Sequence, residues 1–142
     1  MPSVPADAGL EPIRKDLLDL KPFRLRGAVC DACGTRSFPV RDFCPNCLSD
    51  RLHVEALAPH GTVFSFTTVH IAPAGRETPY TLAYVDLDDE VRVFAQISEG
   101  GDRIAIGDRV ELVAVPVRVA DGDVRIGYAF QPSRKLAREA VA

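Results

Sequence analysis

The chain has 142 residues, of which 46% are hydrophobic and 26% charged, and its net charge is −3. This composition is typical of a folded globular protein and excludes a largely disordered chain. No apolar run approaches the ~20 residues that a membrane-spanning helix needs, and residues 1–5 lack the basic and apolar regions of a secretory signal. We therefore expect a cytoplasmic protein whose thiols stay reduced.

Residues 1–23 are predicted to form an N-terminal tail followed by a short docking helix. Four apolar residues recur at the spacing of one helical face: Leu10, Ile13, Leu17 and Leu20. Pro22 would end this helix, because proline lacks the N–H group that a helix interior needs. A helix of this length is not stable alone in water. We expect it to dock either on the core of the chain itself or on a partner protein, and the sequence favours neither.

Residues 24–54 hold two Cys-x-x-Cys pairs, formed by Cys30, Cys33, Cys44 and Cys47. Two residues between cysteines let both sulfurs of one tight turn point at the same ion, and two such turns supply four sulfur ligands. This donor set predicts zinc, with iron as the alternative metal. Four thiolates also close the coordination shell, which indicates a structural site rather than a catalytic one. A segment this small cannot bury enough apolar surface to fold unless a bound metal ion cross-links it.

Two other uses of the cysteines compete with metal binding. A pair of disulfides is the first, and the missing secretory signal argues against it. A redox-active Cys-x-x-Cys is the second, but that chemistry needs only one pair and a thioredoxin-like setting. His53 and His60 lie nearby in the sequence. Because four cysteines already satisfy the ion, both histidines are expected in surface or turn positions.

Residues 55–132 change to a strand pattern rich in β-branched and aromatic residues. Turn signals separate five predicted strands, over residues 62–70, 80–87, 91–98, 109–119 and 124–130. The predicted fold class is therefore mostly β: a rubredoxin-like zinc ribbon followed by a five-stranded OB-fold barrel, with a short N-terminal helix. Residues 133–142 form a C-terminal tail, which is either a frayed helix capped by Ser133 or disordered.

Charge is spread unevenly between these two modules. Residues 21–54 carry six basic and three acidic side chains, whereas residues 55–132 carry six arginines and twelve acidic side chains. A protein that binds single-stranded nucleic acid pairs exposed aromatic residues with a basic groove. The acidic balance of the second module argues against this function, although ribbons and OB-folds both occur in nucleic-acid-binding proteins.

The residues indicate no catalytic site. No cysteine lies outside the metal motif, and no Ser-His-Asp set is evident. His70 and Asp86 could act as a base and the group that orients it, but only if the fold brings them within hydrogen-bonding distance. We therefore predict no catalytic residue in this chain.

A series of short motifs follows the ribbon in a distinctive order. They are residues 61–67 (GTVFSFT), 78–87 (TPYTLAYVDL), 92–96 (RVFAQ), 104–112 (IAIGDRVEL) and 128–132 (YAFQP). In this order the chain resembles the DUF35 family, whose members combine a ribbon with an OB-fold and are associated with acyl-CoA and thiolase-type enzymes. The resemblance covers residues 25–132, and the chain departs from the family pattern in the approach to the first cysteine, residues 23–29.

The resemblance implies a non-catalytic accessory subunit of a thiolase-fold enzyme, whether a thiolase, an acyltransferase or a thiolase-like aldolase. Such a subunit stabilises the complex and helps to form the site for the CoA thioester, while the nucleophile belongs to the partner. A heterotetramer with two copies of each chain is expected, with zinc in the ribbon and acyl-CoA as the ligand of the complex. The alternatives are a free-standing acyl-CoA-binding protein or small enzyme, and a nucleic-acid-binding module.

Two groups of residues are candidates for contact with the CoA thioester. Arginine binds phosphate groups such as those of CoA, and the candidates in the basic half are Arg24, Arg26, Arg36 and Arg41. Aromatic residues of the strands could line an acyl tunnel or fill the barrel core, and these are Phe64, Phe66, Tyr80 and Phe94. Phe64 and Phe66 are expected on one face, because strand side chains repeat every two residues.

Overall fold

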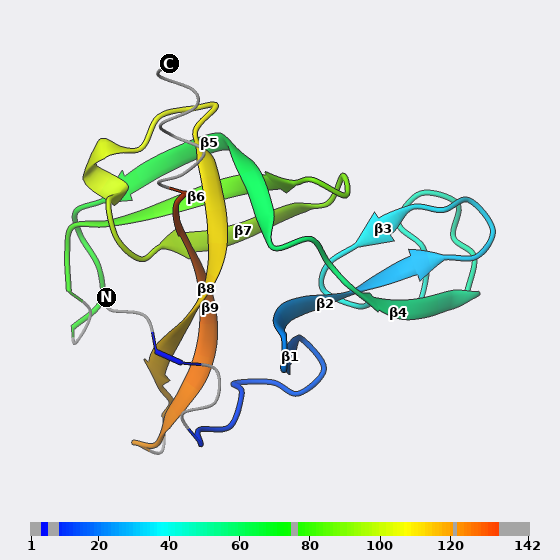
Figure 1. Cartoon of the computed structure of the whole chain (residues 1–142), viewed down its shortest axis with the longest axis horizontal. Coiled ribbons are helices and arrows are strands. Elements are labelled where there is room, and N and C mark those ends of the chain that lie inside the picture. Colours follow the sequence, from blue (N-terminus) through cyan, green and yellow to red (C-terminus); the bar gives the residue numbers. More distant parts are fainter. Residues whose placement is uncertain (1–3, 6–8, 75–76, 121, 134–142) are drawn as a thin grey trace.

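The computed structural model describes residues 4–5, 9–74, 77–120 and 122–133. The chain folds into a small β ribbon beside a larger β barrel (Figure 1). The predicted fold class, a zinc ribbon followed by a five-stranded OB-fold barrel, is confirmed. The structure of the predicted tail over residues 134–142 lies outside the described residues. The described part of the chain has no helix long and apolar enough to cross a membrane.

The ribbon contains four short strands, of which one is central and pairs with the other three. These are β1 (Leu18–Leu20), β2 (Phe23–Cys30), β3 (Arg36–Ser37) and β4 (Leu52–Ala56). The central strand β2 pairs antiparallel with each of the other three. It ends at the first cysteine, and β4 begins shortly after the last one, so the sheet forms the base from which the cysteine turns project.

The predicted N-terminal helix is wrong. Residues 10–17 form no helix, and residues 18–20 form β1, in which Leu18 pairs with Leu25 of β2. Tertiary pairing explains the difference, since a short helix is marginal by itself and the segment gains backbone hydrogen bonds from its neighbours instead. The N–H of Ile13, for example, donates to the carbonyl of Ile126 at 2.8 Å. The apolar side chains are still used, because Leu17 and Leu18 are both buried.

The barrel closes from five strands in the order β5-β6-β7-β9-β8. They are β5 (His60–Val69), β6 (Tyr80–Leu87), β7 (Arg92–Ile97), β8 (Arg109–Arg118) and β9 (Val124–Pro132), and a 3₁₀ turn, η1 (Gly101–Arg103), precedes β8. All pairs are antiparallel except β7 and β9, which run parallel where Ile97 meets Phe130. A five-stranded barrel that closes in this way is the OB-fold.

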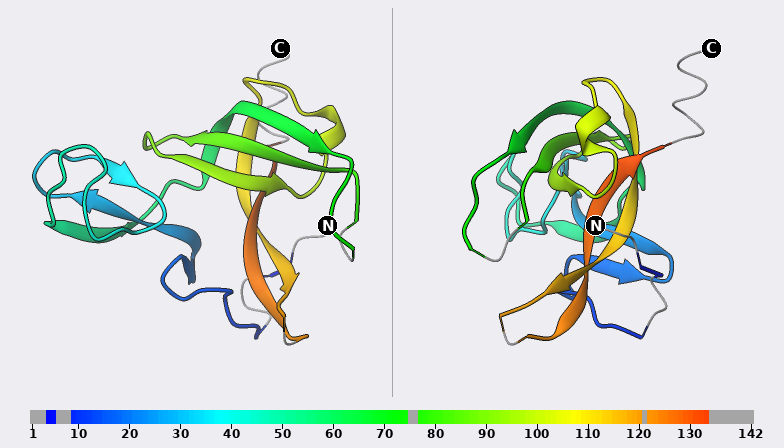
Figure 2. Two further views of the ribbon diagram at one scale, coloured as in Figure 1. Left: turned by 180° about the vertical axis from the view of Figure 1, so that it is seen from behind. Right: turned by 90° about the vertical axis from the view of Figure 1, so that its left-hand side faces the viewer.

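The ribbon and the barrel share one hydrophobic core. Leu25 of β2 and Leu57 of the connecting segment are almost fully buried in the same cluster as Val63 and Phe130 of the barrel. The N–H of Ala58, also in the connecting segment, donates to a carboxylate oxygen of Asp89 in the β6–β7 turn at 2.9 Å. The left view of Figure 2 shows the ribbon beside the barrel, and in the right view the ribbon lies behind it. The two modules are therefore docked on each other rather than merely joined.

Candidate metal centre

The four cysteine sulfurs converge on one point beyond the end of β2. They all lie within 4.8 Å of one another, although the two pairs are separated by ten residues of sequence. Cys30 Sγ lies 3.6 Å from Cys47 Sγ, and Cys33 Sγ lies 3.6 Å from Cys44 Sγ. Metal–sulfur bonds of about 2.3 Å in a tetrahedron require sulfur–sulfur edges of about 3.8 Å. The donor set and its spacing therefore fit a tetrahedral metal ion.

Two backbone turns with the same hydrogen bonds hold the sulfurs. In the first turn, the N–H of Gly34 donates to the carbonyl of Cys30 at 2.9 Å, and in the second the N–H of Leu48 donates to the carbonyl of Cys44 at 3.0 Å. Gly34 and Leu48 both have positive φ, 79° and 66°. The left-handed conformation is easy for glycine and unfavourable for leucine. Leu48 keeps it because the geometry of the second turn requires it.

Hydrogen bonds from the turns stabilise the sulfurs as thiolates. Cys33 Sγ is hydrogen-bonded to the hydroxyl of Thr35 at 3.2 Å, and this contact is the largest cause that lowers the pKa of Cys33 to about 6. The N–H groups of Cys47 and Asn46 donate to Cys44 Sγ at 3.5 and 3.4 Å, and they lower the pKa of Cys44. Thiolate is the form that binds a metal.

The pKa of Cys47 shifts in the opposite direction from the pKa values of Cys33 and Cys44. The backbone of Ser49 lowers the pKa of Cys47, but the adjoining sulfurs of Cys30 and Cys33 outweigh it and raise that pKa to about 12. Crowded thiolates repel one another, and a divalent cation at their centre removes the repulsion. The chemistry of the site thus favours a bound cation, and four sulfur ligands leave no open position for a substrate.

Sequence reasoning missed the residues that support the cysteines. Thr35 and Ser49 occupy equivalent places, since their carbonyls accept hydrogen bonds from the N–H groups of Cys30 and Cys44 at 3.0 and 2.8 Å. A signal was present in the sequence: each Cys-x-x-Cys pair is followed two residues later by a hydroxyl residue. The repeat C-x-x-C-x-[ST] marks two copies of one turn.

The structure contradicts the expectation that Phe64 and Phe66 share a face of β5. The ladder between β5 and β6 shifts register between Val63 and Ser65, which marks a β-bulge around Phe64. After the bulge, Phe66 pairs with Ala83, which is completely buried and faces into the barrel. A bulge adds one residue to a strand and so reverses the alternation beyond it. Phe66 is therefore on the inner face of the sheet, opposite Phe64.

The candidate aromatic residues also do not fill the barrel core. Phe64, Phe66 and Phe94 are 49%, 40% and 48% exposed. Aliphatic side chains and the completely buried Phe130 occupy the interior instead. The alternation of β6 and β7 explains this for Phe94, because it pairs with the exposed Tyr84 on the outer face.

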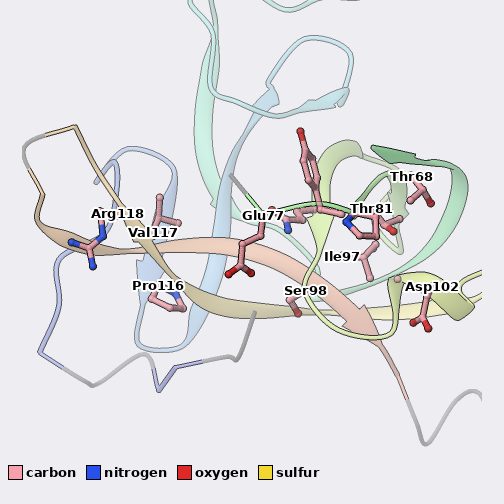
Figure 3. Close-up of a pocket in the computed structure, with 13 residues that line it drawn as sticks. Thr68, Glu77, Thr81, Ile97, Ser98, Asp102, Pro116, Val117 and Arg118 are labelled. Carbon is pink, nitrogen blue, oxygen red and sulfur yellow. The ribbon is translucent and has the colours of Figure 1, made fainter. Parts of the chain in front are cut away.

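Tyr80 lies at the start of β6 and lines a groove of about 830 Å³. The other walls come from the ends of β5 and β7, from η1 and from β8. In the view of Figure 3, Glu77 lies between Pro116 of β8 and Ser98, which follows β7. Phe64, Phe66 and Phe94 are not among the residues that line this groove.

The four candidate arginines occupy three different parts of the ribbon. Arg24 and Arg26 share one face of β2, where Arg24 donates to the carbonyl of Phe23 and Arg26 lies 3.6 Å from a carboxylate oxygen of Asp19. Arg36 is exposed on β3, and Arg41 is exposed in the loop that leads to the second cysteine pair.

The structure does not bring His70 and Asp86 together. His70 is exposed just after the end of β5, whereas Asp86 lies at the other end of the β5–β6 ladder, where it pairs with Thr62. Both carboxylate oxygens of Asp86 accept hydrogen bonds from the guanidinium of Arg92, at 2.6 and 3.1 Å. His53 likewise contacts Asp31 and Glu55 through its two ring nitrogens, and these carboxylates raise its pKa.

Comparison with known proteins decides the family. A model of the ChsH2 rubredoxin-like zinc ribbon domain matches residues 19–53, and a model of the ChsH2 C-terminal OB-fold domain matches residues 54–115. Together they cover the cysteine site and most of the barrel. The chain belongs to the DUF35 family of ChsH2-like proteins. Because the matched ribbon is a zinc ribbon domain and the four sulfurs fit a tetrahedral ion, zinc is the metal that this site holds.

Several DUF35 relatives are similar over most of the chain. Two proteins named benzoylsuccinyl-CoA thiolase subunit BbsA, from Thauera aromatica and Geobacter metallireducens, are 36% identical over 108 residues, which is 75% of this chain and 75% and 73% of theirs. A DUF35 domain-containing scaffold protein from Methanocaldococcus jannaschii is 33% identical and matches 76% of this chain and 81% of its own length.

A solved DUF35 structure has the same fold. The chain matches a structure titled Ltp2-ChsH2(DUF35) aldolase with a TM-score of 0.63 and 31% sequence identity. The match covers 77% of this chain and 84% of that one. The shared region is large enough to include both a ribbon and a barrel.

Proposed function

We propose that this chain is the non-catalytic accessory subunit of a thiolase-fold enzyme that acts on CoA thioesters. The observation that carries the proposal is its similarity, over about three quarters of its length, to a named thiolase subunit and to the DUF35 chain of an aldolase complex. The site agrees with this role, because four sulfur ligands leave the metal no open position for chemistry. In the proposed complex the nucleophile belongs to the partner, and this chain stabilises the assembly in the cytoplasm.

The proposed assembly is a heterotetramer with two copies of each chain, and acyl-CoA is its ligand. Among the eight candidate contact residues, Tyr80 is the one that lines the groove between β5, β6, β7 and β8. This supports a role for the groove in the acyl-CoA site of the complex. Arg24 and Arg26 present two cationic side chains on one face of β2, where they could meet the phosphates of CoA.

The stability of the partner tests the proposal. A thiolase-fold protein that co-purifies with this chain from its source cell is produced alone and together with it, and the thermal midpoint and thiolase or aldolase activity of each preparation are measured. We expect the partner alone to melt at a lower temperature and to lose most of its activity, because part of its apolar interface is then exposed. A partner that is equally stable and equally active alone would contradict the proposal.

A further inference from the structure

The outer surface of the barrel carries an exposed aromatic cluster. Phe64 of β5, Tyr84 of β6 and Phe94 of β7 lie on the outer side of three adjacent strands, and we call these three residues the aromatic face. They are 49%, 46% and 48% exposed. Three half-exposed rings of this size offer on the order of 300 Å² of apolar surface, which is the size of a functional patch on a soluble protein.

Contacts among its residues hold the aromatic face in one arrangement. The rings of Tyr84 and Phe94 pack with their centroids 4.9 Å apart. The guanidinium of Arg92 lies over the ring of Phe64, 3.5 Å from its centroid, and both its Nε and Nη2 donate to Asp86. Side chains that are fixed before binding lose less conformational entropy when a partner covers them. The side chains of the aromatic face are thus already held in place before a partner binds.

The charge pattern of the same surface favours an uncharged partner. Register and alternation place thirteen positions of β5, β6 and β7 on the outer side, both bulge residues included, and two of them carry a formal charge, Asp86 and Arg92, which neutralise each other. In contrast, 26% of the whole chain is charged. Loss of unpaired charge, together with enrichment in aromatic residues and arginine, is the composition that marks the centre of a protein–protein interface.

The opposite side of the barrel is already covered by the chain itself. The N–H of Ile13 donates to the carbonyl of Ile126 in β9, and the N–H of Ile126 donates to the carbonyl of Glu11. The N–H of Val4 donates to the carbonyl of Ala114 in β8. The described part of the N-terminal segment therefore runs along β8 and β9, and within the described residues the aromatic face on β5, β6 and β7 is left about half exposed.

We propose that the aromatic face is the docking surface for the thiolase-fold subunit, and that its occupant is an uncharged, apolar patch of that folded protein. This inference rests on the function proposed above. About 300 Å² is the apolar centre of an interface, since stable complexes bury about 800 Å² on each partner. Four of the surrounding outer positions are Thr62, Ser65, Thr67 and Gln96, and these supply a polar rim.

Substitutions on the aromatic face test the proposal in the co-expressed complex of the full chain with its thiolase-fold partner. The test variant combines Tyr84→Thr with Phe94→Thr, because threonine suits a strand and the positions are exposed. The control variant combines Ile71→Thr with Val124→Thr, which removes exposed apolar side chains away from the face. Dissociation of each complex on dilution is measured by sedimentation velocity, and the free chains are examined by circular dichroism and for zinc content.

We expect the test variant to weaken the complex by about 30-fold or more, as the loss of interface hot spots does, while the control variant binds like the wild type. Both free variants should keep the wild-type spectrum and zinc. Equal affinity of the test variant and the wild type would overturn the docking surface but leave the proposed function intact. A wild-type chain that forms no complex would overturn both.

Two other occupants would also overturn the proposal. If the wild-type chain alone forms a dimer that the test variant abolishes, the face belongs to a second copy of this chain. If the wild-type chain binds a single-stranded DNA oligonucleotide and the test variant does not, the face binds nucleic acid through base stacking.

Discussion

Replacement of Cys44 by serine is expected to remove the metal and unfold the ribbon. Cys44 is completely buried, and its sulfur lies 3.6 Å from that of Cys33. Serine is a poor ligand for zinc, and a structural zinc site contributes about 10–16 kcal/mol to folding of a small module. The effect should reach the barrel, because Leu25 and Leu57 of the ribbon side belong to the same core as Phe130.

Metal analysis and tyrosine fluorescence together measure this effect. All three tyrosines, Tyr80, Tyr84 and Tyr128, lie in barrel strands, so their fluorescence reports barrel unfolding apart from the state of the ribbon. The matched control is Leu48→Asn in the same turn, since Leu48 is 74% exposed and asparagine tolerates its positive φ. We expect one zinc per chain in the wild type and the control, and little in Cys44→Ser. Full zinc content and an unchanged melting curve for Cys44→Ser would contradict a structural metal site.

Replacement of Phe130 by alanine should destabilise the barrel by about 3–5 kcal/mol. Phe130 is completely buried at the point where β9 runs parallel to β7. Its removal leaves a cavity where the barrel closes, and the surrounding strands cannot collapse fully because they are fixed by their ladder hydrogen bonds. A loss of this size is a large fraction of the stability of a domain of 142 residues.

The same substitution at Phe94 provides the control. Phe94 is 48% exposed on the outer side of β7, so Phe94→Ala removes much less buried surface and should cost about 1 kcal/mol or less. Urea unfolding followed by tyrosine fluorescence gives the free energy of unfolding of each variant. Equal losses in the free energy of unfolding for the two variants would contradict the prediction, because Phe130 is completely buried and Phe94 is half exposed.

Much of the fold was predictable from the sequence because its signals are local. The two-residue spacing within each Cys-x-x-Cys pair predicts a metal-binding turn. The strands of the barrel are recognisable because turn residues, such as those at 120–123, separate them. The helix predicted for the N-terminal segment was wrong, because the prediction rested only on the helical spacing of Leu10, Ile13 and Leu17. The segment's backbone partners decide the conformation instead: residues 18–20 pair with the adjacent strand β2, and Pro12 bridges to Ile126 of β9, which is distant in sequence.

The faces of the aromatic residues could not be predicted for a related reason. A bulge of one residue at Phe64 reverses the alternation of β5, and no local sequence signal marks it. The left-handed conformation of Leu48 could not be predicted either. The matching position of the first turn is Gly34, which adopts positive φ easily, whereas leucine gives no such signal. In both places, tertiary structure imposes a conformation that the residue alone does not favour.

Native mass spectrometry of the complex purified from its source cell through a tag on this chain tests the central claim most directly. The account predicts a single assembly whose mass equals two copies of this chain, two copies of a thiolase-fold protein and one zinc ion for each copy of this chain. Zinc and iron differ enough in mass to be distinguished when the complex is denatured in stages. A chain that is recovered alone, or with iron in its four-cysteine site, would contradict the account.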